Sequence, residues 1–194
     1  TDIFAIQSEI AVAIAGQLKT ELTPETLASI EEIPTLNAEA YDLYLQAVKE
    51  GQVWRGADTF NAKISLLEKA VALDPDFINA QVMLVESYGR LYWLGEDPER
   101  IYSTKALELA TEIRRRWPDR IDGRMALGHY YYTVKSDYQS ALTEYQAVEA
   151  VFPNSIELLG QMSASFKRLG RNEEFLQYSK RVVELDPESS AVLG

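Results

Sequence analysis

The feature that most constrains this chain is a proline that recurs at nearly constant spacing after helix-like runs. It stands at Pro75, Pro118, Pro153 and Pro187, so that the intervals are 43, 35 and 34 residues. The runs that end at these prolines are related, as AVALDP at Pro75 and VVELDP at Pro187 show. Since proline cannot continue a helix, each one predicts a helix end. A repeat of this length predicts helical units that stack and bury their apolar faces against copies of themselves.

Residues 154–187 are the most regular copy in length. Apolar residues recur three and four positions apart in two runs, which are Leu159, Met162, Phe166 and Leu169, then Phe175, Tyr178, Val182 and Leu185. This spacing places each set on one face of a helix. Gly170 lies between the runs, where a tight turn favours a residue that tolerates a left-handed backbone. The stretch therefore predicts a helical hairpin.

The whole chain divides along the same lines. An apolar stripe in residues 2 to 19 predicts an extra N-terminal amphipathic helix, and Asn37 predicts the cap of the first repeat helix. Within the second repeat, Asp97 predicts a second helix cap, with Pro98 as the first helical residue. The predicted fold is all-α, an α-solenoid of four helical hairpins. Its expected segments are the N-terminal helix (1–19), a linker (20–37), four repeats (38–77, 78–120, 121–155 and 156–187) and a C-terminal tail (188–194).

Composition excludes several classes of function. The net charge of −11 disfavours nucleic acid and anionic membrane surfaces, because binding to them depends on clustered Lys and Arg. The chain has no cysteine and one histidine, His129, which leaves no basis for a thiolate site or a typical metal site. The sequence also contains no phosphate-binding glycine loop and no catalytic triad pattern. We expect no enzymatic activity, no cofactor and no bound metal.

The repeats resemble the tetratricopeptide repeat family, whose signature includes a Leu-Gly pair and an aromatic residue on the first helix and alanines on the second. Leu127 and Gly128 match the pair, and Ala106 and Ala141 match the first alanine. Lys63 and Phe175 depart from that alanine position. The resemblance covers residues 38–187 and implies a fold in which the first helices line a concave groove that binds a peptide or protein.

A second resemblance concerns the layout of the chain. The segment DIFAIQSEIAVAIAGQL, a proline-containing linker and AYDLYLQA look like the region that joins an output domain to tetratricopeptide tails in bacterial adenylate-cyclase-like or winged-helix regulatory proteins. This implies a sensor or scaffold module in a larger protein. The chain begins at Thr1 and lacks the layout of a signal peptide, so we expect a piece of a longer cytoplasmic protein.

The family resemblance also indicates which residues face the groove. The expected partner-binding residues are Gln46, Lys49, Glu86, Arg90, Met125, His129, Tyr132, Lys167 and Arg168. Some related domains hold the C-terminal carboxylate of a chaperone with Lys and Asn. The matching positions here hold Asp42, Gln46, Met83, Asp122 and Ala126. We therefore expect no binding of a chaperone tail of the EEVD type.

The last repeat suggests an alternative function. Only seven residues of the sequence follow Pro187, so we expect either an exposed apolar end on the final hairpin or a further element after it. The apolar residues Leu176, Val183 and Leu193 would then form a surface for self-association into a homodimer. Binding in the groove and self-association are both open at this point.

Overall fold

The computed structural model describes residues 34–187, which form eight α-helices and one short π-helix and contain no strand. The helices are α3 (Ala38–Glu50), α4 (Ala57–Leu73), α5 (Ile78–Trp93), α6 (Ile101–Arg116), α7 (Asp122–Tyr130), η1 (Tyr131–Lys135), α8 (Tyr138–Glu149), α9 (Ile156–Arg168) and α10 (Asn172–Leu185). They pack as consecutive pairs, which confirms the predicted α-solenoid of four tetratricopeptide-like hairpins. The helix predicted within residues 1–19 and the tail 188–194 lie outside the described residues.

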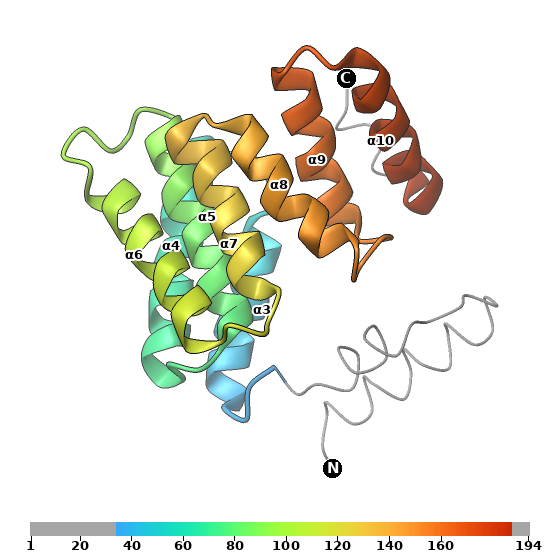
Figure 1. The fold of residues 1–194 in the computed structure, drawn as a ribbon. Helices are drawn as coiled ribbons and strands as arrows, with labels where there is room; N and C mark the ends of the chain where they lie inside the picture. The colour runs from blue at the N-terminus through green and yellow to red at the C-terminus, as the bar shows by residue number, and fades with distance from the viewer. Residues whose placement is uncertain (1–33, 188–194) are drawn as a thin grey trace.

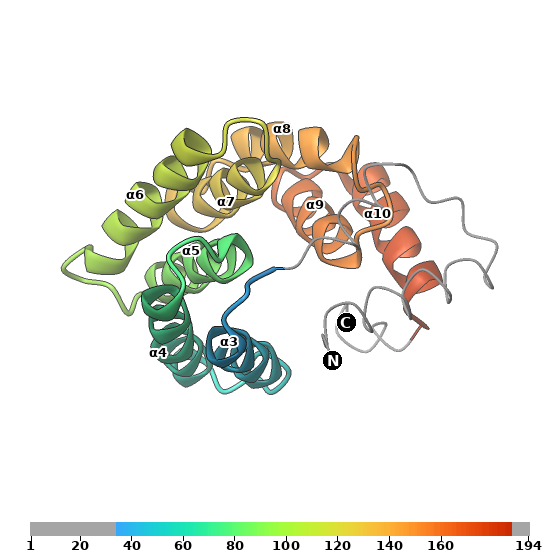
Figure 2. The same ribbon diagram turned by 90° about the horizontal axis from the view of Figure 1, so that it is seen from below.

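The four hairpins follow one another along a curved path (Figure 1). Seen from below, the first helices α3, α5, α7 and α9 lie on the inside of an arc, and the second helices α4, α6, α8 and α10 lie on its outside (Figure 2). Each second helix also contacts the first helix of the next hairpin. The concave face is therefore built from the first helices, with α5 and α7 at its centre.

The helix ends follow the local sequence. The Asn37 side chain accepts hydrogen bonds from the amides of Glu39 and Ala40, as expected for an N-cap. Gly170 has φ +71°, in the left-handed region that the turn between α9 and α10 requires. Helices α4, α6 and α10 each end two residues before their proline. These observations confirm the predicted turn and helix stops.

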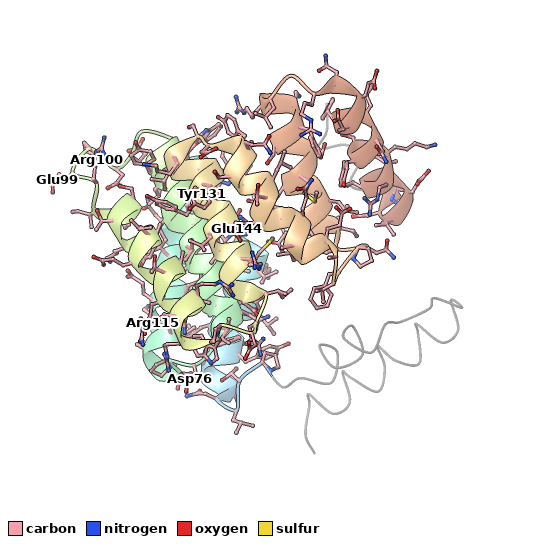
Figure 3. The ribbon with its side chains drawn as sticks, in the orientation of Figure 1. Asp76, Glu99, Arg100, Arg115, Tyr131 and Glu144 are labelled. Atoms are coloured by element: carbon pink, nitrogen blue, oxygen red, sulfur yellow. The ribbon has the colours of Figure 1, made fainter. Side chains whose placement is uncertain are left out.

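The predicted start of α6 is wrong by three residues. Pro98 lies in a turn, and the helix begins at Ile101 after Arg100, whose φ of 58° is left-handed. Asp97 still caps the helix, but from a distance, because its carboxylate accepts the amides of Tyr102 at 3.1 Å and Ser103 at 2.7 Å. Figure 3 shows Glu99 and Arg100 at the tip of this loop, at the outer edge of the molecule.

Two glycines permit close helix packing around α7 and η1. A Cβ at Gly128 would lie 2.3 Å from the ring of Tyr145 on α8, and a Cβ at Gly89 would lie 2.0 Å from the Thr133 hydroxyl. Such separations leave no room for a methyl group. The Leu-Gly pair identified in the sequence therefore has a packing role, since Gly128 lets the buried Tyr145 ring lie directly against α7.

Candidate functional site

A hollow of about 280 Å³ lies where α5, α7 and α9 begin, three of the helices that form the concave face. The polar part of its lining includes Asn79, Asp122 and Glu157, one from each of these helices. The apolar part comes from Val82, Met83, Ile121, Met125, Val148, Phe152 and Leu158, and Tyr44 and Ser155 complete it. The hollow is thus a site to which four hairpins contribute side chains.

Asn79, Asp122 and Glu157 occupy the same place in three consecutive repeats. Each directly follows an isoleucine at the start of its first helix, and they are 43 and 35 residues apart, as the prolines are. Stacking of the repeats brings equivalent positions of neighbouring first helices side by side. The result is a row of three oxygen-bearing side chains along one side of the hollow.

A charged cluster joins the second helix of the first repeat to α5. The Lys63 ammonium lies 3.4 Å from one carboxylate oxygen of Glu86, and the Arg90 Nε lies 3.5 Å from the other. Burial acts to raise the pKa of Glu86, but the cations, Lys63 above all, outweigh it and lower the pKa to about 2. Glu86 is therefore ionised at neutral pH, and its charge is balanced within the fold.

His129 is buried beside this cluster, with a relative exposure of 1 %. Burial lowers its pKa to about 4, and the attraction of Glu86 only partly opposes that effect. The imidazole is therefore neutral at pH 7. Its Nδ1 lies 3.3 Å from the Tyr145 hydroxyl, and its Nε2 lies 3.8 Å from Glu157 Oε1. Because burial raises the pKa of Tyr145, the hydroxyl stays protonated and can donate to Nδ1, which leaves the imidazole proton on Nε2.

Glu157 stands at the opening of the hollow, and 66 % of its side chain is exposed. Enclosure by the groove raises the pKa of its carboxyl, and repulsion from Glu86 adds to this, while Lys63 opposes it. Water reaches most of the side chain and screens these effects, so the shift is smaller than it would be in a sealed site. Among the described residues, His129 is the only basic side chain within 4.0 Å of its carboxylate, and because the imidazole is neutral the pair is not a salt bridge.

At the other end of the groove, two arginine side chains lie against aromatic rings. The Arg90 guanidinium lies 5.8 Å from the centre of the Tyr132 ring, and that of Arg168 lies 5.6 Å from the centre of the Trp93 ring. A hydrogen bond to Tyr132 raises the pKa of Arg168. Arg168 thus links the end of α9 to the end of α5 across η1, in contacts typical of cation–π pairs.

The structure brings together five of the residues expected in the groove: Glu86, Arg90, His129, Tyr132 and Arg168. Met125 lies apart from them in the wall of the hollow. Gln46 and Lys49 are exposed on α3, where the Gln46 amide donates to Asp42 at 2.7 Å. Lys167 points toward α10, with its ammonium 5.3 Å from the centre of the Phe175 ring.

Two of these residues do not offer the exposed surface that we expected. His129 is covered by Tyr145 and by the side chains of neighbouring first helices, and Tyr132 is only 4 % exposed. Tyr132 belongs to η1, where the wider turn of the π-helix changes the face on which side chains emerge. It packs edge-on against Tyr138, with ring centres 5.3 Å apart. The side chains of His129 and Tyr132 are therefore buried beneath the groove surface and do not line it.

Three important residues were absent from the sequence-based site. Glu157 and Asn79 could have been found from the recurring isoleucine followed by a polar residue. Lys63 had a signal too, because it replaces the small alanine at a position that packs closely in related repeats. The structure buries Lys63 and directs its ammonium to Glu86.

The residues expected to mediate self-association differ in how exposed they are. Leu176 on α10 is 65 % exposed, and Val183 is half-buried. Leu193 lies outside the described residues.

Within residues 34–187, no group of three His, Asp or Glu side chains could hold a metal ion. No helix in this same range is long and apolar enough to cross a membrane.

Comparison with known proteins finds similarity only among solved structures. No protein-family model matches the sequence. No curated protein matches it significantly. The solved structure of MamA AMB-1 is similar over 98 % of this chain and 95 % of its own, with 19 % sequence identity and a TM-score of 0.42.

Proposed function

We propose that this chain is a non-catalytic interaction module that binds a peptide or protein segment in its concave groove. The observation that carries the proposal is the hollow formed by side chains from all four hairpins, with an exposed carboxylate at its opening. A site assembled from several repeats suits an extended ligand that crosses them. The groove residues Lys49, Gln46 and Lys167 remain exposed and would extend the contact on either side.

The test is a selection of random dodecapeptides, displayed on phage, against the full 194-residue chain. Met125→Lys fills the hollow with a long cationic side chain. Leu107→Lys makes the same change at an exposed leucine on α6, on the outside of the arc. We expect the selected peptides to lose at least tenfold in affinity with the first variant and to keep it with the second. Equal affinity for both variants, when circular dichroism shows both folded, would argue against groove binding.

A second candidate function, self-association, is favoured by the exposure of Leu176. Large exposed apolar side chains at the end of a solenoid are suited to contact with another surface. Val183 would lie at the edge of that contact, and Leu193 could add to it. Light scattering should show a dimer that Leu176→Glu abolishes and that Leu107→Glu leaves intact. A monomer at all concentrations would rule this function out.

The setting of the module is part of the proposal. We propose that it acts in the cytoplasm as the scaffold or sensor part of a larger bacterial regulatory protein. The support is the layout of residues 2–47, which resembles the junction between an output domain and tetratricopeptide tails. Sequencing the gene upstream of Thr1 tests this, since an output domain should be encoded there.

A further inference from the structure

We propose that the hollow binds a lysine or arginine side chain of the partner, flanked by apolar partner residues. The proposal rests on the groove-binding function above and specifies the class of its ligand, a basic segment. The juxtaposition that carries it is the row of Asn79, Asp122 and Glu157 in a hollow whose other lining residues are mostly apolar.

The polar side of the hollow offers hydrogen-bond acceptors and negative charge. Asn79 contributes a carbonyl oxygen, and Asp122 and Glu157 contribute carboxylates. The described residues that line the hollow include no lysine or arginine. An ammonium or guanidinium group donates several hydrogen bonds, which a row of oxygens on adjacent helices can accept.

The carboxylates of Asp122 and Glu157 differ in how well other side chains of the fold compensate their negative charge. Asp122 accepts a hydrogen bond of 2.9 Å from Arg120. Glu157 faces the neutral His129 and is repelled by Glu86, so its charge is poorly compensated. A partner cation would relieve that repulsion, which makes Glu157 the principal contact and Asp122 a weaker one.

The apolar wall suits the stem of the same side chain. Met83, Met125 and Phe152 are half-buried in the lining of the hollow, and methionine adapts its shape readily to a ligand. Lysine and arginine carry long aliphatic stems that pack on apolar surface while the charged end reaches polar groups. A volume of about 280 Å³ lies just below the range of roughly 300–1,000 Å³ usual for whole small-molecule ligands. It suits one long side chain and its apolar neighbours.

The net charge of the whole chain also favours a basic partner. A net charge of −11 attracts a basic partner at long range and raises the rate of association. The cations closest to the polar row are already paired, Arg120 with Asp122 at 2.9 Å and Lys63 and Arg90 with Glu86 at 3.4 and 3.5 Å, which limits their repulsion of an incoming cation. Long-range attraction and local chemistry therefore select the same class of partner.

The experiment uses the dodecapeptides whose binding Met125→Lys abolishes. Fluorescence anisotropy measures their affinity for the wild-type chain, for Glu157→Gln and for the matched control Glu99→Gln. Glu99 is exposed at the tip of the loop between α5 and α6, beyond the end of α5 opposite the hollow (Figure 3). Each peptide is also made with its arginine replaced by citrulline or its lysine acetylated, which removes the charge and keeps the length.

We expect every groove-dependent peptide to contain a basic residue whose neutralisation weakens binding at least tenfold. Glu157→Gln should weaken binding about fivefold to tenfold, as expected for loss of a partly exposed charge contact. Neutralising the peptide should then have little further effect on that variant, while Glu99→Gln should behave as wild type. Groove-dependent peptides without an essential basic residue would overturn this inference and leave groove binding intact. Recovery of no groove-dependent peptide would contradict both.

Discussion

The packing of α7 on α8 makes one substitution diagnostic of the whole arrangement. In Gly128→Ala the new methyl carbon would lie 2.3 Å from Cε1 and 2.7 Å from Cδ1 of Tyr145. That ring is fully buried and is close to His129, so it has no solvent into which to turn. Either the ring or one of the two helices must move.

The magnitude follows from two opposing effects. Replacing glycine by alanine inside an exposed helix stabilises a protein by about 0.5–1 kcal/mol, because glycine loses more backbone entropy on folding. Overpacking a buried site by one carbon costs about 1–3 kcal/mol. We expect Gly128→Ala to lower the free energy of unfolding by about 1–2 kcal/mol. At Gly160, inside α9, the added methyl group would meet no atom within 4 Å apart from the nearby backbone of its own helix, so Gly160→Ala should be neutral or stabilising.

Urea unfolding followed by circular dichroism provides the measurement, and equal m-values across the variants are required for the comparison. A background of Tyr145→Leu removes the ring, and in it the cost of Gly128→Ala should shrink. That double-mutant comparison separates the clash from any general loss of helix stability. If Gly128→Ala were as stable as Gly160→Ala, the close contact between α7 and α8 would be refuted.

Three further predictions concern charge. The pKa of His129 in the folded chain is about 4, below its ordinary value of about 6.5, so the unfolded chain binds more protons between these pH values. Wild type should therefore lose about 2 kcal/mol more stability than His129→Gln between pH 7 and pH 5; equal losses would contradict the burial of a neutral imidazole. The pKa of Glu157 is raised above its ordinary value, so the affinity for a basic groove peptide should increase as the pH rises from about 5 to 7, and in Glu157→Gln this increase should disappear. Calorimetry should detect no binding of an EEVD-type chaperone tail, because Asp122 and Ala126 stand where related clamps need cations and amides.

The repeat pattern was sufficient to predict the fold because the signals that define it are local. Asn37 accepts amides of its own helix, and Gly170 adopts the backbone angle that only a glycine adopts easily. Pro98 shows where local signals failed. A turn and the left-handed Arg100 delayed the helix, while the carboxylate of Asp97 reached forward to cap it.

The candidate site was harder to predict because it depends on contacts between repeats. His129 lies on a first helix, α7, but its burial depends on residues distant in the sequence, Glu157, 28 residues away, and Tyr145. Tyr132 was misplaced because no sequence signal indicated the π-helix in which it lies. Contacts between helices also decide the packing of the last hairpin, where the hydroxyls of Ser163 on α9 and Ser179 on α10 hydrogen bond to each other at 2.7 Å.

The methionines provide the most direct test of groove binding. The chain has three, of which Met83 and Met125 line the hollow and Met162 is fully buried in the core between α8, α9 and α10. With ¹³C-labelled methionine methyl groups, a nuclear magnetic resonance titration reports on all three sites in one spectrum. Addition of a selected basic peptide should shift the Met83 and Met125 signals and leave the Met162 signal in place. Saturated binding without movement of the first two signals would show that the ligand does not enter the hollow.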